Sequence, residues 1–237
     1  MRFGTIVVVG GGCYGSYYVR QLERARVARR LDWARLLVVD RNPACSLGQA
    51  ESRPASVTMV SADWTSFFAE YLASAAVDAE AHANDAIVPS PLMPHLLFDW
   101  LQARARARWP GRIRAAVPGE FGGIPWQKAG ADGTRYVSYA TWMCPINCIE
   151  PAKCPHTRGP RDWNLHEALA VPSAPAAVLR VTHRAYGVGM VDVADVLAAD
   201  RMLAERLPHV ASILVATASH CHGAVAELKL DGAVSPH

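Results

Sequence analysis

Residues 5–15 read TIVVVGGGCYG, a short run of apolar, mostly β-branched residues that ends in glycines. Gly10, Gly12 and Gly15 fit the pattern Gly-x-Gly-x-x-Gly. In that pattern the first glycine permits a tight turn, the second lets a pyrophosphate approach the backbone, and the third lets the next helix pack on the strand. The N-terminus of that helix then offers free N–H groups to a phosphate. The segment therefore predicts a strand, a phosphate-binding loop and a helix.

A second apolar run, residues 36–39, ends in Asp40. A carboxylate at the end of the second strand can accept hydrogen bonds from both ribose hydroxyls of NAD, and it repels the 2′-phosphate of NADP. The loop and Asp40 together predict an NAD site. The alternative is a glycine-rich structural turn that binds no ligand.

The composition limits the class of protein. The chain has 237 residues, 51% of them hydrophobic, and a net charge of +3. This length and hydrophobicity predict a folded chain of one domain with an insertion, or of two small domains. The mild charge gives no reason to expect a nucleic-acid partner. No apolar run approaches the ~20 residues of a membrane span, and the N-terminus does not resemble a signal peptide. We therefore expect a cytoplasmic protein with no membrane partner.

Apolar runs alternate with amphipathic segments along most of the chain, which is typical of a parallel sheet covered by helices. The predicted strands are residues 3–9, 36–39, 57–60, 86–88, 177–181 and 213–217, and residues 224–230 are a final antiparallel strand. The predicted helices are residues 14–30, a segment after Asp63, residues 94–108 and residues 191–207. The expected fold is α/β, a doubly wound Rossmann-like parallel sheet of about six strands. Residues 1–110 would form its dinucleotide-binding half and residues 176–237 its completion, while residues 111–175 would be an irregular insertion rich in Cys, Trp and Pro.

The first half of the chain resembles a known family. The segments GGGCYG, VVDRNP, VSADW and NDAIVPS follow one another within residues 3–108. This order resembles the N-terminal NAD-binding domain of potassium-uptake regulators, the TrkA-N or RCK type. The resemblance implies that Gly10, Gly12 and Gly15 face the pyrophosphate, that Asp40 faces the adenosine ribose, and that Asp63 lies near the adenine. It also implies a regulatory role, although the sequence after residue 108 departs from that family.

The insertion contains a cysteine cluster. Residues 144–156 read CPINCIEPAKCPH, which places Cys144, Cys148 and Cys154 within eleven residues. Cysteines of a cytosolic chain more often bind metals or do redox chemistry than form disulfides. Thiolates hold iron–sulfur clusters and zinc, so both are candidates here. Cys221 is the fourth ligand that we predict, and His156, His166, a substrate or a bound water are the alternatives. The alternative is a set of reduced cysteines that pack as small apolar residues.

Two further segments carry histidines near the ends of predicted strands. Ser219-His220-Cys221-His222 follows the sixth strand, and His183 follows the fifth. In an open parallel sheet, ligands bind outside the carboxyl ends of the strands. That edge would gather the glycine loop, Asp40, Ser90 and these histidines. We predict Ser90 as a cofactor contact and His183, His220 and His222 as proton-transfer residues.

These features predict an NAD(H)-binding oxidoreductase with an iron–sulfur or zinc centre near the nucleotide. Its expected partner is a small-molecule substrate. A homodimer is compatible with the sequence. Two alternatives stay open. One is a regulatory module that senses a nucleotide or redox state without catalysis. The other is a transferase that uses S-adenosylmethionine, because such sites share a glycine loop and an acidic residue after the second strand.

Overall fold

The computed structural model describes residues 1–51, 53–146, 148–170 and 175–232. The chain divides into two compact units, which we describe separately. Unit 1 comprises Met1–Met93, Ile146–Ile149 and Thr182–Leu197, and unit 2 comprises Pro94–Pro145, Glu150–Val181 and Ala198–His237. Each unit contains one six-stranded sheet with parallel and antiparallel strands, so the protein is of the mixed α/β class.

The sheet of unit 1 has the strand order β3-β2-β1-β4-β10-β9. Its first four strands are parallel: β1 (Arg2–Val9), β2 (Asp32–Asp40), β3 (Val57–Ser61) and β4 (Ala86–Val88). The hairpin of β9 (Thr182–Ala185) and β10 (Val188–Asp192) then continues the sheet, because β10 pairs antiparallel with β4. The strand order reverses direction between β1 and β4, with the glycine loop at the carboxyl end of β1.

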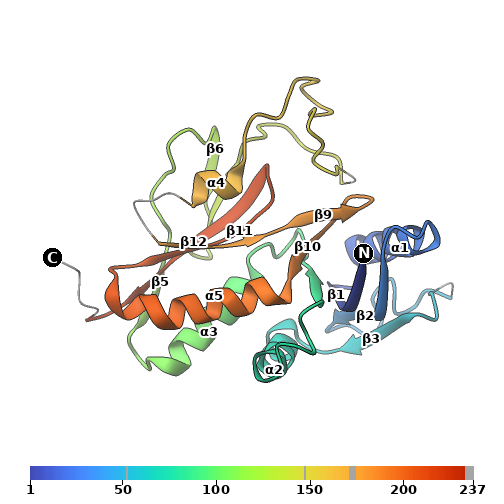
Figure 1. Ribbon diagram of the computed structural model, residues 1–237, viewed down its shortest axis with the longest axis horizontal. Helices are drawn as coiled ribbons and strands as arrows, with labels where there is room; N and C mark the ends of the chain where they lie inside the picture. The colour runs from blue at the N-terminus through green and yellow to red at the C-terminus, as the bar shows by residue number, and fades with distance from the viewer. Residues whose placement is uncertain (52, 147, 171–174, 233–237) are drawn as a thin grey trace. The chain divides into compact units, whose positions relative to one another are not determined.

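Helices α1 (Cys13–Val27) and α2 (Trp64–Val77) lie on opposite faces of this sheet (Figure 1). Side chains alternate between the two faces of a strand. Ile6 and Val8 of β1 accordingly pack in one cluster with Leu22 and Ala25 of α1. The intervening Val7 is also fully buried. Burial on both faces explains why this strand is a continuous apolar run rather than an alternating one.

The sheet of unit 2 is mostly antiparallel. It contains β5 (Ile113–Ala116), β6 (Trp126–Ala129), β7 (Arg135–Ser138), β8 (Ala176–Arg180), β11 (Ile213–Ala218) and β12 (His222–Leu230). The order is β6-β7-β12-β11-β8, with β5 also paired to β12, and only β8 and β11 are parallel.

Three helices and one short 3₁₀ helix complete the described secondary structure. They are α3 (Leu96–Arg108), α4 (Leu165–Leu169), α5 (Val193–Arg206) and η1 (Leu207–His209), and the division between the units falls within α5. In unit 2, Leu165 and Leu169 of α4 form a core cluster with Leu214 and Ala216 of β11. Helix α3 contacts β11 and β5.

The structure corrects the expected single sheet. The fifth and sixth predicted strands correspond to β8 and β11, which are parallel neighbours as expected but belong to the second sheet. The position beside β4 is instead occupied by β10, an antiparallel strand. The hairpin that supplies it turns at Tyr186 and Gly187, both at positive φ. Two consecutive residues with positive φ suit the twist of a tight hairpin, so this segment forms a turn between two strands.

The predicted insertion is also more ordered than expected. Residues 111–175 include β5, β6 and β7, which add to β12 or to one another. The predicted final antiparallel strand is confirmed as β12. Among the described residues, no helix is long and apolar enough to cross a membrane.

Candidate functional site

The glycine loop of unit 1 has the geometry that its motif predicts. Gly10 has a φ of +85°, which only glycine adopts without strain, and its N–H donates to the carbonyl of Val39 at 2.8 Å. A Cβ on Gly15 would lie 1.8 Å from the carbonyl oxygen of Gly10. The loop therefore turns tightly out of β1 and packs directly against the first turn of α1.

The middle of this loop can be approached from outside. A Cβ built on Gly12 would meet no atom within 4 Å. Gly12 is the N-cap of α1, so no side chain caps the helix, and the first turn contains no acidic residue. The free N–H groups of a helix N-terminus carry a partial positive charge. An anion that approaches Gly12 would meet these groups.

Asp40 lies beside the loop, at the end of β2. Its Oδ2 accepts a hydrogen bond from the N–H of Gly11 at 2.7 Å, and its Oδ1 accepts one from the N–H of Asn42 at 2.8 Å. Each carboxylate oxygen has two lone pairs, so both can still accept a bond from a hydroxyl. The structure thus brings together the predicted loop and the predicted acidic residue.

The other predicted residues of unit 1 have local roles in the fold. Asp63 is the N-cap of α2, and its Oδ1 accepts hydrogen bonds from the N–H groups of Thr65 and Ser66 at 2.9 and 3.4 Å. Ser90 follows β4, is buried, and accepts a bond from the N–H of Leu92 at 3.3 Å. His183 lies in β9, opposite Gly189 of β10.

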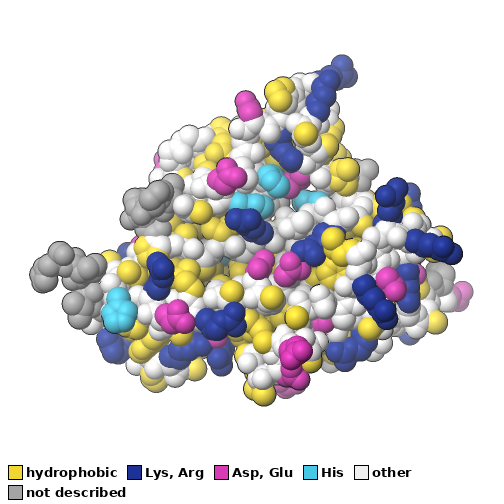
Figure 2. Space-filling model, in the orientation of Figure 1, with side chains coloured by type: hydrophobic (Ala, Val, Ile, Leu, Met, Phe, Trp, Pro, Cys, Tyr) yellow, Lys and Arg dark blue, Asp and Glu magenta, His cyan; other side chains and the backbone are white. Residues whose placement is uncertain are grey.

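In unit 2 the predicted histidines lie at the turn between β11 and β12, residues 219–222. Glu150 binds this turn: its two carboxylate oxygens accept hydrogen bonds from the N–H groups of His220 and Cys221 at 3.1 and 3.2 Å. Its Oε2 also lies 3.2 Å from Nδ1 of His220. The Nδ1 of His222 lies 3.0 Å from the hydroxyl oxygen of Ser138. Figure 2 shows histidine side chains at the surface over this end of β11 and β12.

Glu150 was not predicted from the sequence. Its side chain is 7% exposed, and its φ is +50°, which costs energy in a residue other than glycine. His166, one of the alternative fourth metal ligands, lies next to the same turn, with Nε2 2.6 Å from the carbonyl oxygen of Ala218 and its ring 5.0 Å from that of His220. No local pattern marks either residue, because their partners lie more than 50 residues away.

The predicted metal ligands differ in their surroundings. Cys221 is buried and its Sγ accepts a hydrogen bond from the indole N–H of Trp163 at 3.3 Å; burial raises the pKa of its thiol to about 11. The pKa of the Cys154 thiol is instead lowered, chiefly by the backbone N–H of Thr157, with help from the charge of Arg161. Cys154 is thus the thiol that more readily becomes a thiolate.

The described residues do not contain a group of three or more His, Cys, Asp or Glu side chains arranged to hold a metal ion. Cys144, Cys154 and Cys221 belong to unit 2, whereas Cys148 belongs to unit 1. The iron–sulfur or zinc centre at these four cysteines therefore stays a prediction from their spacing.

Fold and site together define a two-sheet α/β protein with a glycine-rich loop at the end of its first strand. A family model described as "Uncharacterized protein, C-terminal domain" (AF_1314_C) matches residues 97–231, more than half of the chain, and the chain belongs to this family. No curated protein and no solved structure matches it. The matched residues cover α3 and most of unit 2, whereas the glycine loop and Asp40 lie outside them.

Proposed function

We propose that the chain binds NAD(H) at the glycine loop of unit 1 and acts as an NAD-dependent oxidoreductase on a small-molecule substrate. The observation that carries the proposal is the close approach at Gly15 combined with the open, uncapped backbone at Gly12. The third glycine of such a motif packs the helix on the strand, while the second leaves room for a pyrophosphate.

The topology of unit 1 supports the same proposal. In the order β3-β2-β1-β4, the chain runs to one side from β1 and returns to its other side at β4. Ligands of open α/β sheets bind at this kind of switch point, outside the carboxyl ends of the strands. The glycine loop follows β1 there, and Ser90 follows β4. The alternative from the sequence stays open, a module that resembles the TrkA-N type, in which the nucleotide would regulate rather than react.

Bound NAD(H) would supply or accept a hydride. The chain's own part is to hold the pyrophosphate at Gly12 and the ribose at Asp40, and to move a proton to or from the substrate. His183, in β9 of unit 1, is the residue of this unit that we assign to proton transfer, since an imidazole can act as a general acid or base. His220 and His222 belong to unit 2 and remain proton-transfer candidates from the sequence. Turnover of a substrate with NADH would support the enzyme, and binding without turnover would favour the regulatory module.

Gly12→Asp separates nucleotide binding from folding. Because a side chain at Gly12 would meet open space, and aspartate is a favourable N-cap, the variant should be as stable as the parent. The new carboxylate would occupy the path of the pyrophosphate and repel it. We expect NADH binding to weaken by roughly tenfold or more, as measured by fluorescence titration, with an unchanged or higher Tm.

The matched control is Gly119→Asp, since a side chain there also meets no atom within 4 Å and the residue lies in unit 2. It should bind NADH as the parent does. Equal NADH affinity in the parent and Gly12→Asp would contradict the proposal, as would S-adenosylmethionine binding in place of NADH.

Asp40 should set the choice between NADH and NADPH. The parent should prefer NADH, because the carboxylate repels the 2′-phosphate. Asp40→Asn keeps an oxygen for the N–H of Gly11 and removes the charge. We expect the preference to shrink by about tenfold, measured as the ratio of the two dissociation constants. A parent that binds both nucleotides equally would disprove this role of Asp40.

A further inference from the structure

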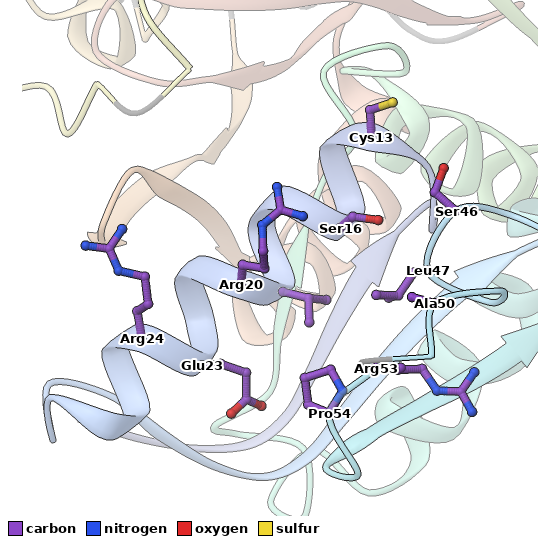
Figure 3. A pocket seen from close by; sticks show the side chains of 11 residues that line it. Cys13, Ser16, Arg20, Glu23, Arg24, Ser46, Leu47, Ala50, Arg53 and Pro54 are labelled. Carbon is purple, nitrogen blue, oxygen red and sulfur yellow. The ribbon is translucent and has the colours of Figure 1, made fainter.

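A groove of about 650 Å³ lies in unit 1 between α1 and the connection from β2 to β3, of which Ser46, Leu47, Ala50, Arg53 and Pro54 line it. Figure 3 shows the side chains that line it from both sides. Cavities of 300–1,000 Å³ are the usual size for small-molecule sites. None of Gly10, Gly12, Gly15 or Asp40 lines this groove, and it meets the glycine-loop region only at the first turn of α1.

The groove is lined by three arginines, Arg20 and Arg24 of α1 and Arg53 of the facing segment. Within the described part of the chain, none of the three forms an ion pair with a carboxylate. Arg24 donates to the neutral Gln21 at 2.9 Å and lies over the ring of Tyr186, 5.1 Å from its centre. Its charge is therefore held in place but not neutralised.

One acidic residue, Glu23, also lines the groove. Its Oε1 accepts a hydrogen bond from the hydroxyl of Ser56 at 2.5 Å, which keeps the carboxylate close to the connecting segment. One carboxylate against three guanidinium groups leaves the groove positively charged. Figure 2 shows basic side chains gathered over α1.

The remaining wall of the groove is apolar and includes Val19, Leu47, Ala50 and Pro54. Val19 and Leu47 are almost wholly buried in the core of unit 1, so the apolar surface open to a ligand is that of Ala50 and Pro54, which are half-buried. An inorganic ion would leave such a surface in water. A ligand with a flat or apolar body and an anionic end would cover the wall and reach the arginines.

We propose that this groove binds a phosphate-bearing small molecule of nucleotide size. Arg20 and Arg53 would contribute positive charge from opposite sides of the groove, since their guanidinium groups point away from each other in Figure 3. Arginine suits this role because its planar guanidinium can donate two parallel hydrogen bonds to one phosphate. This second site is separate from the NAD(H) site of the proposed function, since a different set of residues forms it. The protein would thus respond to a phosphorylated metabolite in addition to its nucleotide.

The test uses ATP and inorganic pyrophosphate as probes, titrated by calorimetry into the Gly12→Asp protein. That background blocks the glycine loop, so the probes report on the groove alone. Arg20→Gln and Arg53→Gln should each weaken ATP binding by about fivefold, as expected for the loss of a partly exposed charge-assisted hydrogen bond. ATP should bind more tightly than pyrophosphate, because only ATP covers the apolar wall.

Two further variants sharpen the result. Glu23→Gln removes the one negative charge and should strengthen ATP binding by about twofold to fivefold. Arg30→Gln is the matched control, because Arg30 is exposed in unit 1 but does not line the groove. This variant should bind ATP with the same affinity as the Gly12→Asp protein.

Unchanged binding in both Arg20→Gln and Arg53→Gln, or an equal loss in Arg30→Gln, would overturn the proposal. Tight binding of citrate or of a polyglutamate peptide with no binding of ATP would also overturn it, since the groove would then select carboxylates or an acidic protein. A failure of NADH binding in the parent would contradict the proposed function and leave this result untouched.

Discussion

Asp85→Ala is expected to lower the free energy of unfolding by about 3–5 kcal/mol. The Asp85 side chain is 2% exposed. Its Oδ1 accepts a hydrogen bond from the N–H of Thr5 at 2.6 Å, and its Oδ2 accepts one from the hydroxyl of Tyr71 at 2.6 Å. The same Oδ2 lies 2.7 Å from Nδ1 of His82. Alanine would leave the buried N–H of Thr5 and the partly buried hydroxyl of Tyr71 without this acceptor, and a buried group without a partner costs about 1–3 kcal/mol.

This cluster joins three elements of unit 1. Asp85 immediately precedes β4, Thr5 lies in β1, and Tyr71 lies in α2. The hydroxyl of Thr5 in turn accepts hydrogen bonds from Arg35 of β2 at 2.8 and 3.1 Å. Burial and the hydrogen bond to Asp85 also raise the pKa of Tyr71, so its hydroxyl stays a donor at neutral pH.

Urea unfolding at pH 7 would measure the loss. Glu80→Ala is the control, since Glu80 is exposed nearby, and it should change stability by less than about 0.5 kcal/mol. The loss of unfolding free energy for Asp85→Asn should lie between those of Asp85→Ala and Glu80→Ala, because the one amide oxygen of asparagine can replace only part of the carboxylate. A loss below about 1 kcal/mol for Asp85→Ala would show that the cluster does not stabilise unit 1.

The elements around the glycine loop could be predicted because their signals are local. The run at residues 5–9, the three glycines and the amphipathic segment after them lie within one stretch of chain, and β1 and α1 form there. The contact between Asp40 and the loop could be predicted as well, since parallel neighbours end at the same edge of a sheet.

The division into two sheets could not be predicted in this way. Strand β12 pairs with β5 and β7, so residues such as Leu228 and Ala115 meet across more than 100 positions of sequence. No periodicity within a segment reports such a partner. The hairpin of β9 and β10 turns locally at Tyr186 and Gly187, but the predicted strands do not include it.

The candidate site of unit 2 shows the same limit. The histidines at residues 219–222 follow a strand and could be found, but Glu150 reaches them from a proline-rich segment 70 positions away. Its role depends on a backbone conformation at positive φ that nothing in the residue type predicts. Chemistry that depends on such long-range contacts becomes visible only in the folded chain.

His95 should make unit 2 sensitive to acid. Its side chain is buried, its ring stacks on that of Phe98 with centroids 4.6 Å apart, and within the described residues neither ring nitrogen has a hydrogen-bond partner. Burial lowers its pKa to about 3, against the opposing effect of the charge on Asp132. In the unfolded chain the pKa of His95 is near 6.5, so between about pH 6.5 and pH 3 the unfolded state binds a proton at His95 and the folded state does not.

The sign of the effect follows from that difference. Above about pH 6.5 both states are neutral at His95 and the residue adds no pH dependence. As the pH falls below that value, the unfolded state gains the proton first, so stability falls by up to about 1.4 kcal/mol per pH unit until the pH approaches the folded pKa. His95→Phe removes the titrating group and the two unpaired nitrogen atoms. The stability of this variant should therefore depend less on pH below about pH 6.5 than the stability of the parent does.

Urea unfolding of the parent and of His95→Phe between pH 7 and pH 4.5 would measure the difference, because other titrating groups contribute equally to both. The gap in stability should widen in favour of the variant as the pH falls, by about 2 kcal/mol over this range. His95→Leu is a second variant for the case that the phenylalanine ring packs poorly. Its stability difference from the parent should depend on pH in the same way as that of His95→Phe. Parallel profiles for the parent and both His95 variants would mean that His95 accepts its proton in the folded protein.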